Sequence, residues 1–472
     1  MMVWNDYVRI QHGSTTDRVT FRADSEKVRG QPSEWGRLRP PTNDAHLACH
    51  RTRKIIIAWL STATDENDRI PLGFEKAMPQ RSDAHLESLP TEVVLQILTQ
   101  IADVHCLWNL LVSSPVASRV FDQYSDDVFW PSVADGIAPS QTQDAIRCIV
   151  ALRAGAFRST PVDQLVGKIR DREAGIVLGR SLDQGYYGIS TMDTTAKPSL
   201  RVMRSVLAVA GRIHALSRLC IGHYLARLAA AKTDGRLDAA PGWLDDVRPS
   251  WIEEQRITRA FWRVQLVLEL NVAARTSLVQ SPVDMSDGAP GELDIESFYD
   301  SDTSNLKVAY HEVMTAMEFL EGLGFRGDHD PTRPISLGRL PLPIHSQMDM
   351  SPSMDGMPAN SVCRRSSLVM PADGLWIVDS MARNAHSPIK YAGFRPYRNL
   401  GFAIWDRERL ARMGLASPPG NGRVTGLGSY FPCWLGLLDP HEMAQAEGKM
   451  REAECRGGRL NPLQPMIQDN GS

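Results

Sequence analysis

The chain has 472 residues, but it has few cysteines, little net charge and no hydrophobic run of membrane length. Its seven cysteines are scattered, which suits reduced thiols better than a disulfide framework. A formal net charge of −3 gives no reason to expect nucleic acid as the main partner. The aliphatic run at 55–60 is far shorter than the roughly 20 residues that cross a bilayer, so no membrane partner is expected. No secretory signal is visible at the start, and we expect an intracellular protein of the cytoplasm, the nucleus or both.

Signatures of catalysis are also missing. Neither a Gly-x-Ser-x-Gly elbow nor a His-Glu-x-x-His motif occurs. Adjacent carboxylates do not share one face of a helix and so form no acid/base pair; they lie at 126–127, 245–246 and 253–254. The glycine-rich stretch 420–428 follows two prolines and lacks the flanking strand and helix of a dinucleotide site, so we interpret it as a loop. We expect no catalytic residue and no cofactor.

Two small groups of residues have side chains of the kind that bind metals. One group is His46, Cys49 and His50, and the other is Cys220 and His223. A structural zinc site needs four ligands at usable spacing, and neither group supplies them. Cys220 also lies on the apolar stripe of a predicted helix, where core packing is the better interpretation. No metal site is predicted.

One segment has a more specific pattern. Pro90 suits the first position of a helix, and Glu92 falls in the first turn, where the helix dipole favours a negative charge. Four residues then follow the spacing of one apolar helix face, namely Val94, Ile97, Leu98 and Ile101. Val93 and Leu95 lie off that face, so the helix is apolar on more than one side. One side can pack on its own domain and the other on a partner.

Two more short helices are predicted downstream. The apolar residues of the first are Val104, Leu107, Trp108 and Leu111, and those of the second are Val116, Val120, Phe121 and Tyr124. Ser114-Pro115 separates the two helices, because a residue before proline avoids the α region. A unit of about 45 residues buries too little surface to be robust alone. It should therefore lean on a partner or on the next domain.

Residues 88–129 resemble an F-box. The resemblance rests on Leu-Pro-x-Glu at 89–92 and on Leu95, Ile97, Leu98, Leu107 and Leu110. The Ser-Ser-Pro-Val-Ala of 113–117 and the segments 251–256, 261–266 and 401–406 are similar to those of fungal F-box proteins. F-boxes bind a Skp-family adaptor and thereby join a cullin–RING ubiquitin ligase. The resemblance implies adaptor contacts at Leu89, Pro90, Glu92, Val93, Leu95, Leu98, Leu107 and Leu110.

The whole pattern predicts a mainly α protein, in which a three-helix F-box-like module precedes an irregular α-helical body. The expected divisions are a mostly disordered segment at 1–84, the module at 85–130, the body at 140–325, a low-order linker at 331–371, a C-terminal segment packing on the body at 373–440 and a flexible tail at 448–472.

Within the body and the C-terminal segment, Ser250 and Glu253 fit a capping box at the start of a helix. Gly211 and Gly222 are expected to bend or split the longest helix. Helices are predicted at 144–157, 199–232, 250–273, 304–323 and 403–413, with a loop at 175–187 and a short strand at 374–378.

The expected function is that of a non-catalytic substrate receptor in the ubiquitin conjugation pathway, which presents an unknown protein target. Many F-boxes have a basic-aromatic third helix, and 113–115 depart from that pattern. This departure leaves open a helical scaffold that keeps the F-box-like fold without joining a ligase. An enzyme is a third class, and it would need polar residues that converge in a deep pocket of 199–325.

Overall fold

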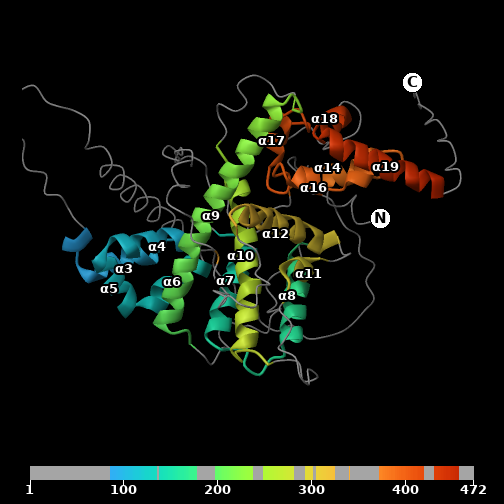
Figure 1. Ribbon diagram of the computed structural model, residues 1–472. Coiled ribbons are helices and arrows are strands. Elements are labelled where there is room, and N and C mark those ends of the chain that lie inside the picture. The colour runs from blue at the N-terminus through green and yellow to red at the C-terminus, as the bar shows by residue number, and fades with distance from the viewer. Residues whose placement is uncertain are drawn as a thin grey trace, which may run out of the picture. The chain divides into compact units, whose positions relative to one another are not determined.

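The computed structural model describes residues 86–134, 138–177, 197–237, 248–280, 293–300, 304–324, 340, 372–418 and 430–456. All of them belong to one compact unit, residues 79–472, and they are mainly helical (Figure 1). These ranges contain no strand, and a single isolated bridge joins Pro161 to Gln280. The predicted mainly α fold is confirmed. The predicted disorder of 1–84 and, apart from Leu340, the predicted linker of 331–371 lie outside the described residues.

The N-terminal module has one α-helix more than the three predicted, and a short 3-10 helix precedes them. It consists of η2 (Leu86–Ser88), α3 (Thr91–Thr99), α4 (Val104–Ser113), α5 (Pro115–Gln123) and α6 (Ser125–Ala134). Asp103 begins α4, because its side chain accepts a hydrogen bond from the Cys106 N–H at 3.0 Å. Ser114 begins α5 in the same way through the Ala117 N–H, with Pro115 in the first turn.

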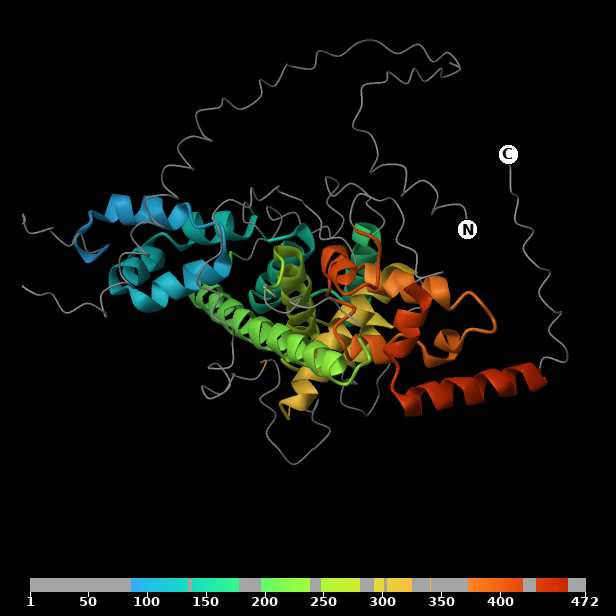
Figure 2. The same cartoon turned by 90° about the horizontal axis from the view of Figure 1, so that it is seen from above.

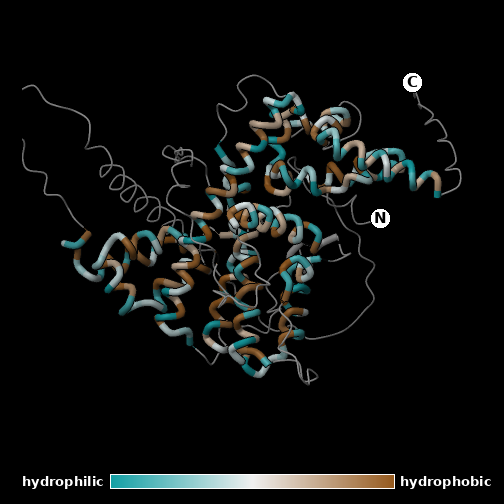
Figure 3. The backbone as a smooth tube through the Cα atoms, in the orientation of Figure 1, coloured by the Kyte–Doolittle hydropathy of each residue, from teal (hydrophilic) through white to brown (hydrophobic). Residues whose placement is uncertain are grey.

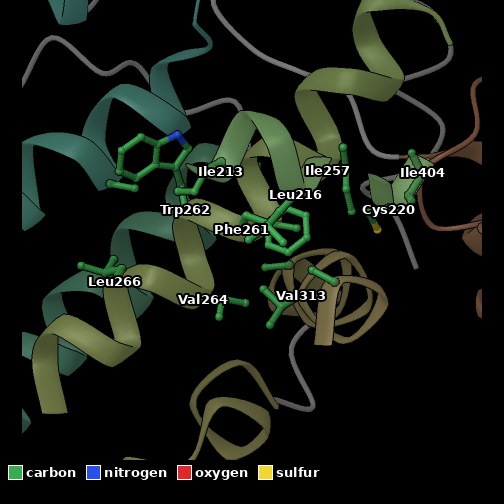
Figure 4. Close-up of a cluster of buried hydrophobic side chains, with 14 of the residues drawn as sticks. Ile213, Leu216, Cys220, Ile257, Phe261, Trp262, Val264, Leu266, Val313 and Ile404 are labelled. Carbon is green, nitrogen blue, oxygen red and sulfur yellow. The ribbon is translucent and has the colours of Figure 1, made fainter. Parts of the chain in front are cut away.

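The body is built around one long buried helix. Its helices are α7 (Ser140–Arg153), α8 (Val162–Val177), α9 (Leu200–Thr233), α10 (Trp251–Arg275), α11 (Ile295–Tyr299) and α12 (Ser304–Gly322). α10 packs against α7, α9 and α12, and Figure 4 shows Phe261 and Trp262 of α10 near aliphatic side chains of α9 and α12. Hydrophobic residues are concentrated on α7, α9 and α10 (Figure 3).

The helix starts of the body follow the sequence closely. Ser199 caps α9, and the capping box of Ser250 and Glu253 is formed in both directions, as predicted. Gly211 and Gly222 do not split α9, which runs without interruption for 34 residues. α8 was not anticipated, and it occupies the beginning of the region where a loop was expected.

The C-terminal segment consists of short helices and one longer one. They are α14 (Asp373–Met381), α15 (Pro388–Ala392), α16 (Arg395–Arg398), α17 (Arg407–Arg412), α18 (Phe431–Gly436) and α19 (Pro440–Arg456). Arg398 joins this segment to α12 by donating to Glu318 at 2.6 Å and to His311 Nδ1 at 3.2 Å. Burial, together with the Arg398 charge, lowers the pKa of His311 to about 3, so the ring stays neutral and accepts that bond.

The structure differs from three predictions for this segment. Residues 374–378 form part of α14 rather than a strand, because Leu375, Val378 and Met381 recur at helical spacing and all are buried. The helix predicted at 403–413 begins only after Asp406, which caps it. The tail expected to be flexible from 448 is helical as far as Arg456, because α19 packs along α15.

A buried network of charges crosses the body, and we call it the α10 network (Glu173, Arg259, Arg263 and Glu312). Both carboxylate oxygens of Glu312 accept from Arg259, and Oε2 also accepts from Arg263 Nη1 at 2.6 Å. Arg263 makes a second, bidentate pair with Glu173 at 3.0 and 2.6 Å. The arginine side chains are 1–2% exposed. Two positive and two negative charges therefore compensate one another in the core, where a lone charge is costly.

Replacing Glu312 with glutamine should destabilise the body strongly, because Arg259 and Arg263 would then share a single carboxylate. Breaking a buried pair costs about 3–5 kcal/mol in the free energy of unfolding. Urea denaturation followed by circular dichroism measures this change. Glu452→Gln is the matched control, because the pair of Glu452 with Arg456 is largely solvent-exposed and should contribute less than about 1 kcal/mol. Equal stability of the two variants would contradict a structural role for the network.

Candidate docking surface

The hydrophobic interior of the N-terminal module is formed by its own helices together with α9 of the body. α3 packs on α5 and α6, while α4 packs on α5 and on α9 of the body. Its buried residues include Val94, Leu98, Leu107, Leu111, Val120, Phe121, Val128, Phe129 and Val133. Ser114 Oγ donates to Glu87 at 3.2 Å and so fixes η2 against the junction of α4 and α5. The Leu-Pro turn that precedes α3 is thereby held in one position.

The opposite side of α3 faces solvent. Pro90, Glu92 and Val93 are exposed, and Leu89 and Leu95 are half-buried. Among the described residues, the exposed large hydrophobic side chains are Val93, Val112 and Ile252, with exposed fractions of 39%, 65% and 38%. Two of the three therefore belong to this module. We define the candidate docking surface as Leu89, Pro90, Glu92, Val93 and Leu95.

The structure divides the predicted contact residues into two groups. Leu98 and Leu107 have no exposed surface, so the prediction that they contact a partner directly is wrong. Leu98 shares the inward face of α3 with Val94, and Leu107 lies in the same interior. Leu110 is half-buried on α4. Adaptor contacts at Leu110 and at the five residues of the docking surface stay a prediction.

Val112 is a surface residue that the sequence reading missed. It lies near the end of α4 and is the most exposed large hydrophobic side chain among the described residues. The sequence of α4 indicates such a residue, because the helix is apolar around most of its circumference and cannot bury every side against one neighbour.

The module is attached to the body through a contact that we call the α4–α9 joint (His105, Trp108, Gly211 and His214). The indole of Trp108 lies so close to Gly211 that a Cβ at this position would collide with the ring. The imidazoles of His105 and His214 are stacked, with their centroids 3.5 Å apart and their planes inclined by 12°. Figures 1 and 2 show the module beside the N-terminal part of α9.

Charge complementarity adds to this attachment. Residues 86–134 contain six carboxylates and a single basic residue, whereas α9 has six basic residues and no acidic one. Arg204 of α9 donates to Asp122 at 2.6 Å and to Ser118 Oγ at 2.7 Å, and its guanidinium lies over the Phe121 ring. The ion pair is partly exposed, so it orients the module more than it stabilises it.

The titratable groups of the joint are held neutral. Burial lowers the pKa of His105, and it lowers the pKa of His214 to about 4, with a further contribution from the charge of Arg218 in each case.

Of the two groups of possible metal ligands, the structure describes Cys220 and His223. Cys220 is fully buried in the core of the body, and His223 packs edge-on against Phe319. Across the described ranges no group of three or more histidine, cysteine or acidic side chains could hold a metal ion. The group at 46–50 and the glycine-rich stretch 420–428 lie outside the described residues.

α9 is long and apolar enough to cross a membrane by length and composition alone. Half of its most apolar window is buried inside the body, and a core helix of this length passes the same test. The contacts of α9 with α4, α7, α10 and α12 account for its apolar character.

No family model, no curated protein and no solved structure matches this chain.

Substituting Gly211 with alanine should displace Trp108 and loosen the joint, because the added methyl group overlaps the indole. Overpacking of this kind costs about 1–3 kcal/mol in stability. Urea denaturation measures this loss of stability. Hydrogen–deuterium exchange should show that the substitution accelerates exchange in α4 more than in α10.

Gly222→Ala is the matched control, since Gly222 lies on the same helix with nothing within 4 Å of the new methyl group. It should gain up to about 1 kcal/mol, because alanine favours a helix interior. If both substitutions were equally stabilising, the joint would not depend on close contact at Gly211.

Proposed function

We propose that the protein is an F-box-type substrate receptor, which binds a Skp-family adaptor of a cullin–RING ubiquitin ligase and presents an unknown protein target. The observation that carries this proposal is the placement of the Leu-Pro-x-Glu turn. Pro90 and Val93 are exposed beside half-buried Leu89, on a helical module whose α4 packs on the body. An exposed apolar turn on a rigid support is the arrangement that a helix-in-groove interface needs.

The proposed binding mode rests on a few apolar anchors. Leu89, Pro90 and Val93 would enter an apolar depression on the adaptor, and Glu92 would lie at the polar rim. Because Ser114 fixes η2 through Glu87, the turn loses little conformational freedom on binding. Preorganisation of this kind favours affinity from a small surface.

The proposed role requires no catalytic residue in this chain. A receptor accelerates ubiquitin transfer by holding its target near a ubiquitin-loaded enzyme, which raises the effective concentration of the acceptor lysine. Such a role favours a fixed geometry between docking surface and target. The α4–α9 joint and the pair of Arg204 with Asp122 supply a rigid connection from the module to the body.

A second candidate function is a helical scaffold that keeps the fold without joining a ligase. The observation in its favour is that α4 already packs on α9, so the module does not need a partner to complete its interior. The two candidates differ in what a native complex contains. A receptor brings adaptor and cullin together, whereas a scaffold of this kind brings no cullin.

Val93→Asp should weaken binding to a purified Skp-family adaptor, because a charge would be placed within the proposed apolar contact. Loss of a central anchor costs at least about 2 kcal/mol, which is roughly 30-fold in affinity. Titration calorimetry measures the affinity, and circular dichroism checks that the helices remain. Leu89→Asp and Leu95→Asp should have the same effect, with some loss of stability because both side chains are half-buried.

Ile252→Asp is the matched control, because Ile252 is exposed to almost the same extent as Val93 but lies on α10. It should bind the adaptor like the unmodified protein. Undiminished binding of the Val93→Asp variant would refute this docking surface. Adaptor without cullin in a native complex would favour the scaffold.

A further inference from the structure

We propose that the α4–α9 joint is an acid-sensitive latch, in which protonation of the stacked His105 and His214 releases the N-terminal module from the body. The latch concerns the attachment of the module and holds whether or not the module binds an adaptor. Its consequence for a ligase rests on the proposed function.

The geometry of the two rings carries this inference. His105 comes from α4 and His214 from α9, and the rings stack face to face across the interface. A ring centroid distance of 3.5 Å leaves no room for water or an anion between them. Two neutral imidazoles stack favourably at this distance, whereas two imidazolium ions repel each other. The contact therefore depends on the protonation state of both partners.

The surroundings of the pair do little to compensate a positive charge. His105 Nε2 is 3.0 Å from the Asn109 side chain, and the buried Nδ1 of His105 has no hydrogen-bond partner among the residues that the structure describes. Arg218 of α9 adds a positive charge that opposes protonation of either ring. Asp103 at the start of α4 favours protonation, but its carboxylate is engaged by the Cys106 N–H and its effect is smaller than that of burial.

One further acidic group belongs to this neighbourhood. Glu254 of α10 interacts with Arg218, and burial raises the pKa of Glu254 to about 7. As the pH falls below 7, Glu254 becomes neutral and no longer balances the charge of Arg218. Acidification therefore leaves the positive charge of Arg218, which opposes protonation of both rings, less balanced.

The direction of the pH dependence follows from the depressed pKa of the histidines. In the released state each imidazole regains a pKa near 6.5, so the released state binds more protons than the closed state between about pH 6.5 and 4. The closed joint is fully favoured above pH 6.5 and weakens as the pH falls through that window. At pH 5.5 a single histidine with a closed-state pKa of about 4 increases the released population about tenfold.

Release would change geometry rather than adaptor affinity. The docking surface lies on α3, which does not form the joint, and its exposed residues remain the same when α4 leaves α9. If the protein is a receptor, an adaptor would stay bound at low pH while the target is no longer held at a fixed distance from the ligase. The latch would regulate presentation of the target without dissociating the complex.

Hydrogen–deuterium exchange of the full chain at pH 7.5 and 5.5 tests the latch, with labelling times scaled for the intrinsic exchange rate. Protection of α4 and of the facing part of α9 should fall about tenfold or more at pH 5.5, relative to α10. His214→Gln and His105→Gln each remove one titrating ring and should reduce that fall several-fold. Two separate variants keep the test informative if one of them does not fold.

His223→Gln is the matched control, because His223 lies on α9 but packs against Phe319 rather than α4. It should behave like the unmodified chain. Unchanged protection of α4 at pH 5.5, or an equal loss in both joint variants and in the unmodified chain, would overturn the latch. The measurement needs no adaptor, so failure of adaptor binding would refute the proposed function and leave this result intact.

Discussion

Arg259 and Arg263 place two full positive charges in the core of the body, and the surrounding helices are arranged to neutralise them. Glu312 of α12 accepts from both arginines, and Glu173 of α8 accepts from the second. Arg259 Nη1 also donates a hydrogen bond to Gln141 Oε1 of α7 at 2.7 Å. A hydrophobic core tolerates small shifts of one helix along another, but these bidentate pairs accept one register only. The network therefore specifies how α7, α8, α10 and α12 meet.

The position of the N-terminal module depends on this core, because α9 contacts both. α10 packs on α9, and α9 in turn receives α4 at the joint. The module brings acidic groups and α9 brings basic ones, so long-range attraction and close packing favour the same arrangement. α3 packs mainly on α5 and α6 of the module, and its outer face is exposed to solvent. Rigid attachment and an available surface are thus compatible in one small unit.

Local signals in the sequence predicted helix starts such as that at Ser250. Features that depend on contacts between distant parts of the chain could not be predicted in this way. The cap at Ser250 depends on residues three positions apart, which a sequence reading can see. Leu98 and Leu107 were assigned to a partner because an apolar side chain at helical spacing does not reveal which neighbour covers it. His105 and His214 are more than 100 residues apart, and nothing local pairs them. In the sequence, the buried arginines of α10 cannot be distinguished from solvent-exposed ones, because their partner Glu312 lies about 50 residues away.

Gly211 has a consequence for how this chain diverges. A glycine in the middle of a helix weakens it by up to about 1 kcal/mol, so the position is retained only while something requires the missing methyl group. Here the requirement is the indole of Trp108. We therefore expect the two positions to change together: a smaller side chain at 108 would make room for a larger residue at 211, whereas a larger residue at 211 would collide with the indole of Trp108. A close contact between two helices can in this way constrain which residues related sequences carry at both positions.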